Sequence, residues 1–171
     1  QCFGWAKNHA IVMPDADLDE VADALIGAGY GSAGERCMAI SVAVPVGEET
    51  AEALRAKLVE RVEKLSVGRS DDAASDFGPL VSADAVERVN HYVQIGVDEG
   101  ADLVVDGRGF TLAGHENGFF TGASLFDKVT PEMRIYQEEI FGPVLQIVRA
   151  ADYEEALRLP SAHEYGNGVA I

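Results

Sequence analysis

The cysteine at position 37 has neighbours that could make it a nucleophile. It follows the glycine-rich turn Gly31-Ser-Ala-Gly34 and comes directly after Arg36. A neighbouring guanidinium favours the thiolate, which is the reactive form of a cysteine, and glycines let backbone N–H groups approach a reacting carbonyl oxygen. The pattern therefore indicates attack on a carbonyl group. The structural alternative is a small buried residue at the start of the strand predicted over 39–46, and local features alone favour that alternative slightly.

Other candidate groups form weaker patterns. The histidines are scattered and lack the spacing of metal ligands; they are His9, His91, His115 and His163. We expect His9 and Cys2 to be structural. The spacing Gly29-x-Gly31-x-x-Gly34 matches a dinucleotide fingerprint, but it follows a predicted helix rather than a strand, so we reject it as a phosphate loop. The adjacent carboxylates Glu138 and Glu139 should point apart in an extended segment.

The elements that must position Cys37 alternate between helices and strands. Apolar residues at helical spacing predict helices over 18–26, 54–65, 86–97 and 152–159. Short apolar or β-branched runs predict strands over 10–13, 39–46, 103–105, 119–126, 144–148 and 169–171. We expect Asp15 or Asp17 to cap the first helix, Gly27 or Gly29 to end it, and Ser82 to cap the third. The alternation predicts an α/β fold with a mostly parallel sheet flanked by helices.

Composition limits the class of protein. The chain has 171 residues and 18.2 kDa, which is room for one ordinary domain. Its formal net charge of −16 repels phosphate backbones and argues against nucleic-acid binding. The longest uncharged stretches, residues 37–47 among them, are too short to cross a bilayer, so we expect no membrane partner. Two cysteines suit a reducing compartment, the cytoplasm or the mitochondrial matrix of a eukaryote.

Three segments resemble the aldehyde dehydrogenase superfamily, and their order and separations along the chain also agree with it. Residues 30–39, YGSAGERCMA, resemble its active-site cysteine signature; residues 138–144, EEIFGPV, resemble its nicotinamide-side motif; residues 76–81, DFGPLV, resemble a further family segment. The chain opens on Gln rather than Met and closes on an apolar run. We therefore expect residues 1–171 to be part of the cysteine-bearing catalytic domain, truncated at both ends, with the N-terminal NAD-binding domain and the C-terminal segment absent.

The resemblance also implies roles for individual residues. Cys37 would be the catalytic nucleophile, and its backbone N–H would contribute to an oxyanion hole. Arg36 would bind the carboxylate of the substrate through a bidentate contact. Glu139 would hydrogen-bond the nicotinamide ribose of NAD, and Phe141 would pack near the nicotinamide ring. The implied partner is a small semialdehyde, no metal is implied, and the parent protein would be a homo-oligomer, a dimer or a tetramer.

Two further segments, residues 6–16 and 165–168, resemble the CoA-acylating branch of the superfamily. Hydrolytic members carry a water-activating glutamate four residues before the lysine that matches Lys7, and Phe3 stands there in this chain. The resemblance therefore implies CoA as co-substrate and acyl acceptor. Two alternatives stay open: a hydrolytic aldehyde or semialdehyde dehydrogenase, and a fragment with no activity of its own.

Overall fold

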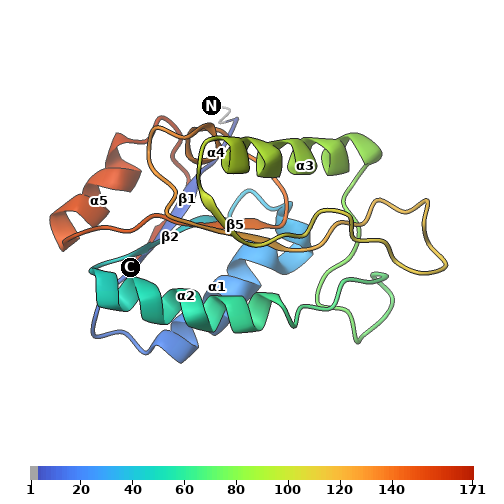
Figure 1. Cartoon of the computed structure of the whole chain (residues 1–171), viewed down its shortest axis with the longest axis horizontal. Coiled ribbons are helices and arrows are strands. Elements are labelled where there is room, and N and C mark those ends of the chain that lie inside the picture. Colours follow the sequence, from blue (N-terminus) through green and yellow to red (C-terminus); the bar gives the residue numbers. More distant parts are fainter. Residues whose placement is uncertain (1–3) are drawn as a thin grey trace.

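A computed structural model describes residues 4–171 (Figure 1). The expectations for Cys2 and Phe3 lie outside these residues. In chain order the elements are β1 (Asn8–Val12), α1 (Leu18–Tyr30), a 3₁₀ turn (Gly31–Gly34), β2 (Ile40–Pro45), α2 (Glu48–Val62), α3 (Ala83–Asp98), β3 (Asp102–Val105), β4 (Ser124–Asp127), α4 (Arg134–Gln137), β5 (Val144–Ile147), α5 (Tyr153–Ala162) and β6 (Val169–Ala170).

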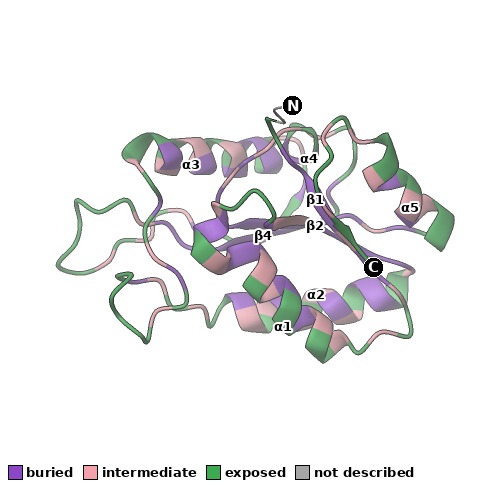
Figure 2. Cartoon of the chain, turned by 180° about the vertical axis from the view of Figure 1, so that it is seen from behind, coloured by how far each residue is buried: buried purple, intermediate pink, exposed green. Residues whose placement is uncertain are grey.

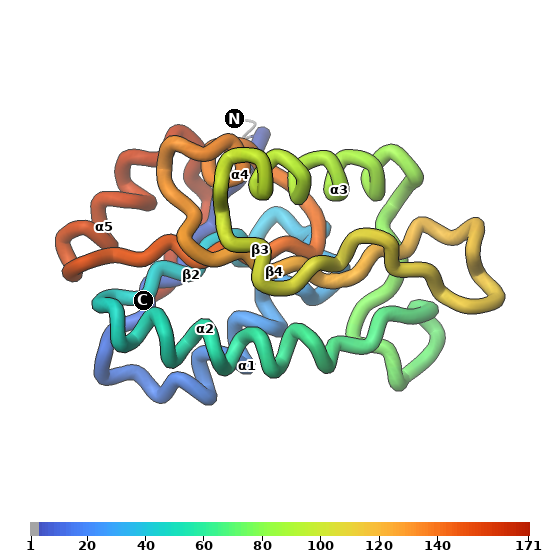
Figure 3. Tube along the Cα trace, in the orientation of Figure 1, coloured from blue at the N-terminus to red at the C-terminus, as the bar shows by residue number. Residues whose placement is uncertain are grey.

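The strands form one six-stranded sheet in the order β3-β4-β5-β2-β1-β6. All neighbours are parallel except β3 and β4, so the predicted α/β fold with a mostly parallel sheet is confirmed. Helices α1 and α2 cover one face and α3 lies across the other (Figures 1 and 3). The central strands are buried between these layers (Figure 2). Within residues 4–171, every helix is too short or too polar to cross a membrane.

Helix starts follow their capping residues closely. The Asp17 carboxylate accepts hydrogen bonds from the first turn of α1, and the Ser82 hydroxyl accepts one from Ala85 N in α3, as predicted. The predicted end of α1 at Gly27 or Gly29 is wrong. The helix continues to Tyr30 because this side chain is buried and its hydroxyl donates to the Ser124 carbonyl at 2.9 Å.

The strand predicted over 119–126 is wrong in its first half. Residues 119–123 form no ladder because loops use their backbone groups: Leu80 N donates to Phe119 O at 2.8 Å, and Gly122 N donates to Gly107 O at 2.9 Å. Phe119 is also exposed, so burial does not favour a strand there. Regular pairing begins only at Ser124.

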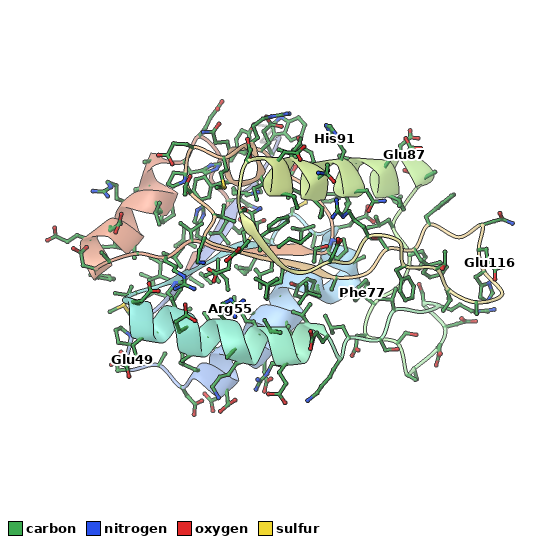
Figure 4. The ribbon with its side chains drawn as sticks, viewed as in Figure 1. Glu49, Arg55, Phe77, Glu87, His91 and Glu116 are labelled. Atoms are coloured by element: carbon green, nitrogen blue, oxygen red, sulfur yellow. The ribbon has the colours of Figure 1, made fainter. Side chains whose placement is uncertain are left out.

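A buried ionic cluster closes the far end of β4. The Asp127 carboxylate is fully buried and contacts Arg55 Nε at 3.2 Å and Arg149 Nη2 at 2.5 Å. Figure 4 labels Arg55 on α2, the helix that this cluster connects to the sheet. A buried carboxylate requires such partners. The cluster belongs to the scaffold rather than to the candidate site, because Asp127 ends its strand whereas the site residues precede theirs.

Candidate active site

Four loops meet at the amino ends of the parallel strands. They are residues 4–7 before β1, 35–39 before β2, 138–143 before β5 and 164–168 before β6. The four strands are neighbours in the sheet, so their amino ends lie at one edge. The loops line a cavity of about 600 Å³, whose walls include Trp5, Cys37, Glu139, Phe141 and Tyr165. Cys37, Glu139 and Phe141, to which the family resemblance gives roles, therefore share one cleft.

Cys37 lies in a turn before β2, and its side chain is exposed. The alternative in which it is a buried strand residue is therefore wrong. Its carbonyl oxygen accepts hydrogen bonds from two side-chain amides, Asn8 Nδ2 at 2.9 Å and Asn167 Nδ2 at 2.6 Å. Among residues 4–171, no acceptor binds the Cys37 backbone N–H, which leaves this donor free for a ligand.

The turn before Cys37 has an uncommon backbone. Ser32, Ala33 and Gly34 have φ angles of 54°, 55° and 69°, so three successive residues are left-handed. Such conformations are costly for residues with a side chain, and they cluster at functional sites. A Cβ atom on Gly34 would overlap the carbonyl oxygen of Gly142. Backbone contact at this glycine therefore holds the cysteine loop against the loop that carries Glu139 and Phe141.

Replacing Gly34 with alanine should destabilise the fold by clearly more than a left-handed backbone alone explains. Gly109 provides the matched control, because its φ is 75° and a Cβ there would meet nothing within 4 Å. Gly109→Ala should cost about 1–2 kcal/mol for the left-handed alanine, whereas Gly34→Ala adds an overlap worth about 1–3 kcal/mol. Urea unfolding of both variants measures the difference. Equal losses of stability would contradict the close contact.

The adjacent carboxylates Glu138 and Glu139 point apart, as expected. Glu139 Oε1 accepts a hydrogen bond from Ala6 N at 3.1 Å and lines the cavity. Glu138 instead accepts from Arg134 Nε at 3.0 Å and Tyr92 Oη at 2.6 Å. The bond from Arg134, supported by the Tyr92 hydroxyl, lowers the pKa of Glu138. Only Glu139 of the pair is therefore placed to contact a molecule in the cleft.

Two basic side chains hold the loop that carries Glu139 and Phe141, and neither has a role in the sequence-based predictions. Lys7 is buried, and its Nζ donates to Ile135 O at 2.6 Å and Glu138 O at 2.8 Å. This agrees with the position of the first strand beside α4 (Figure 1). Arg88 on α3 donates to the next part of the loop, through Nε to Ile140 O at 3.1 Å. Neither contact has a local sequence signal, because each joins segments far apart in the chain.

The burial of Lys7 should make stability depend on pH. Burial lowers the pKa of Lys7 from 10.5 to about 7, whereas in the unfolded chain it stays near 10.4. Above pH 7 the unfolded state therefore binds more protons than the folded state, so this contribution to stability rises with pH. From about pH 7 to about pH 8.5, the free energy of unfolding should rise by about 1.5 kcal/mol relative to Lys7→Met. Urea titrations of both proteins test this, and a constant difference would contradict it.

Arg36 is exposed beside Cys37, and its guanidinium turns toward the end of α1. Its Nη2 donates to Gly27 O at 2.7 Å, a second hydrogen bond to a carbonyl that already accepts from Gly31 N at the end of the helix. The residue also lines a narrow cavity together with Cys37 and Glu139. The structure therefore places Arg36 near Cys37, and its role in binding a carboxylate stays a prediction.

His9 has the structural role that the sequence suggested. It is fully buried, its Nδ1 lies 2.8 Å from Lys7 O, and its Nε2 lies 2.9 Å from the Tyr136 hydroxyl. Burial lowers the pKa of His9 to about 4, so the ring is neutral at physiological pH. Within residues 4–171, no three His, Cys, Asp or Glu side chains group as metal ligands.

An aromatic pair forms the outer wall of the cavity. Trp5 and Tyr165 stack with their ring centroids 6.3 Å apart and an interplanar angle of 21°. Trp5 is exposed and has a φ of 76°, an uncommon conformation for a bulky residue. His163 supports the wall from behind, because Tyr165 N donates to its Nδ1 at 2.9 Å. The sequence showed no pattern that indicates this wall.

The fold and this site match one family. The profile described as the aldehyde dehydrogenase family matches residues 5–171, and the chain belongs to that family. The chain is 61% identical over 171 residues to the malonate-semialdehyde dehydrogenase of Pseudomonas aeruginosa, covering all of this chain and 34% of that protein. It is 46% identical over 166 residues to the mitochondrial acylating methylmalonate-semialdehyde dehydrogenase of Arabidopsis thaliana, covering 97% of this chain and 27% of that protein.

Solved structures agree with these relatives. The methylmalonate-semialdehyde dehydrogenase of Oceanimonas doudoroffii superposes with a TM-score of 0.94 at 55% identity, covering 97% of this chain and 34% of that one. A Sinorhizobium meliloti structure of the same description, in complex with NAD, superposes with a TM-score of 0.96 at 65% identity, covering 98% and 34%. The chain thus spans about a third of the length of the relatives that it matches.

Proposed function

We propose that this chain is the cysteine-bearing catalytic part of an NAD-dependent malonate- or methylmalonate-semialdehyde dehydrogenase that transfers the acyl group to CoA. The observation that supports this most strongly is the shared cleft, where an exposed Cys37 faces Glu139 and Phe141. The names of the similar proteins support the substrate class. Because those proteins are about three times as long, the remaining length would supply the NAD-binding domain and a C-terminal segment.

The cleft fits the nicotinamide riboside half of NAD. Glu139 offers a carboxylate that could accept hydrogen bonds from ribose hydroxyls, and the half-buried Phe141 offers an aromatic surface for a planar ring. The pyrophosphate half fits less well, because the formal charge of −16 repels an anion. A cleft that fits only the nicotinamide riboside half suits a cofactor whose remaining part is bound by another domain. NAD⁺, when bound, would supply the hydride acceptor.

Cys37 would carry the covalent chemistry. Its thiolate attacks the aldehyde carbon, forming a C–S bond, and the carbonyl electron pair moves onto the oxygen. The free backbone N–H of Cys37 donates to that oxyanion, as one member of an oxyanion hole. After the hydride leaves, the acyl group is held on Cys37 as a thioester. Arg36 would orient the carboxylate of the substrate, using guanidinium donors other than the one bound to Gly27 O.

The β-carboxylate explains the next step. The bond between the carboxylate and the α-carbon breaks, CO₂ leaves, and the electron pair enters an enolate that is delocalised onto the thioester carbonyl. A proton from solvent then completes the acyl group. The CoA thiolate attacks this thioester and releases the Cys37 thiolate, giving acetyl-CoA from malonate semialdehyde and propionyl-CoA from methylmalonate semialdehyde. This acyl transfer between thiols needs no water-activating base, because the CoA thiolate is itself the nucleophile.

The decisive experiment identifies the product. The full-length enzyme is incubated with malonate semialdehyde, NAD⁺ and CoA, and the products are separated and weighed by mass spectrometry. Acetyl-CoA in a one-to-one ratio with NADH supports the proposal. A free carboxylic acid in its place would favour the hydrolytic alternative, and no NADH from any semialdehyde would exclude dehydrogenase activity.

A further inference from the structure

The carbonyl group of the proposed nucleophile is held from two sides by side-chain amides. We propose that Asn8 and Asn167 are positioning residues that fix the backbone of Cys37, so that its N–H faces the oxygen of a bound carbonyl substrate. The inference rests on the proposed role of Cys37 and adds two residues to it. Neither residue touches the reacting atoms, and both act through the Cys37 backbone.

Asn8 provides the buried half of this amide pair. Its Nδ2 donates to Cys37 O at 2.9 Å and to Ala39 O at 2.8 Å, and its Oδ1 accepts from Gly168 N at 2.8 Å. Every polar atom of the side-chain amide therefore has a partner, which fixes its orientation. This one side chain on β1 therefore binds both the cysteine loop and the segment before β6, and fixes their positions relative to each other.

Asn167 provides the exposed half, and its features are those of a positioning residue. Its side chain is exposed, so burial of apolar surface contributes little to keeping it there. Its φ of 120° is uncommon for a residue other than glycine. Within residues 4–171, the one side-chain hydrogen bond of Asn167 runs from Nδ2 to Cys37 O at 2.6 Å. The unfavourable backbone conformation of Asn167 is thus tolerated at the position where its Nδ2 can donate to Cys37 O.

The two donors together restrict the Cys37 peptide. A carbonyl oxygen has two lone pairs, and the amides of Asn8 and Asn167 supply one hydrogen bond for each. Rotation of the Cys37 carbonyl would break both bonds at once. The peptide group that follows the Cys37 Cα atom therefore keeps one orientation before a substrate arrives, which limits rotation about the ψ angle of Cys37 and with it movement of the unbound N–H. Preorganised donors of this kind stabilise developing negative charge without a reorganisation cost.

The variant Asn167→Gly distinguishes a role of Asn167 in orienting Cys37 from a role in stabilising the fold. Glycine accepts a positive φ readily, so the variant loses the amide donor without adding backbone strain. Asn117→Gly is the matched control, because Asn117 is also exposed and adjoins Glu116, which lies at the outer end of a loop (Figure 4). Both variants are made in the full-length enzyme, with Cys37→Ser as the blank. The readouts are the rate constant for acylation of Cys37 by p-nitrophenyl acetate and that for its alkylation by iodoacetamide.

The two probe reactions differ in whether an oxyanion forms during attack by Cys37. Acylation forms a tetrahedral oxyanion, whereas alkylation at a saturated carbon forms none. We expect Asn167→Gly to slow acylation by about five- to tenfold, the effect of one lost hydrogen bond, and to leave alkylation and the melting temperature unchanged. Asn117→Gly should change none of these. Equal acylation rates in Asn167→Gly and the parent would overturn the proposal, as would a parallel fall of both rates.

Neither probe requires aldehyde oxidation, so the proposed function can fail separately. A parent enzyme that is acylated at Cys37 but oxidises no semialdehyde would refute the proposed function, while the Asn167→Gly comparison still decides the positioning role. A parent whose acylation rate equals that of Cys37→Ser would overturn both, because Cys37 would then not attack carbonyl groups.

Discussion

Replacing Cys37 with alanine should abolish aldehyde oxidation in the full-length enzyme. We expect kcat to fall by more than about 10⁴-fold, because alanine can form no thiohemiacetal and no thioester, and removal of a covalent nucleophile has effects of this order. Cys37→Ser should be nearly as inactive, because its hydroxyl ionises far less readily than a thiol near neutral pH. The measurement is steady-state NADH formation from malonate semialdehyde with saturating CoA.

The loss should come from chemistry rather than unfolding. The Cys37 side chain is exposed, so its removal opens no cavity in the core. The melting temperatures of both variants should therefore match that of the parent. Binding of NAD⁺ should also persist, because Glu139 and Phe141 are unchanged. A Cys37→Ala enzyme that still turns over at a substantial rate would show that another group attacks the aldehyde.

Omitting CoA should reduce turnover to a single round. Without CoA, the full-length enzyme should release a burst of about one NADH per active site and then slow by about 10²- to 10⁴-fold, the usual contribution of a general base to the step it serves. By the family resemblance, Phe3 stands where hydrolytic relatives carry that base, so an unactivated water would have to attack the thioester. CoA brings its own thiol, part of which is ionised near neutral pH. Stopped-flow absorbance of NADH, with and without CoA, measures both phases.

The matched variants Phe3→Glu and Phe3→Leu test the reason for this dependence. A carboxylate at position 3 should raise CoA-independent turnover, whereas leucine should leave it low. Phe3 lies outside the residues that the structure describes, so its alignment rests on the resemblance. Equal steady-state rates with and without CoA in the parent would favour the hydrolytic alternative over acyl transfer to CoA.

The sequence predicted the scaffold well because its signals are local. Helical spacing marked α1, α2 and α3, and the caps at Asp17 and Ser82 were visible as residue types. Predictions failed where tertiary contacts outweighed local preference. Tyr30, with its buried ring and hydroxyl bond, extends α1 past the glycines that were expected to end it. Residues 119–123 read as a strand, but their backbone groups pair with loops.

The site could be predicted only in part. The residue types around Cys37 left its role open, and the family resemblance supplied Arg36, Glu139 and Phe141. The groups that hold these residues in place have no local sequence signal, because the residue type of an asparagine or a lysine does not reveal a hydrogen-bond partner far away in the chain. Asn167 and Cys37 are 130 positions apart, and the partners of Lys7 lie 128 and 131 positions away.

Those long separations also govern how the cleft can form during synthesis. Asn8 and its partner Gly168 are 160 positions apart, and at usual rates of translation roughly ten to thirty seconds pass between them. During that interval the sheet lacks β6, and the Cys37 carbonyl lacks its second amide. Contacts between residues so far apart in the sequence form late and slowly. A ribosome-bound nascent chain that ends before Asn167 should therefore carry a flexible cysteine loop, and the cleft should form only as β6 joins the sheet.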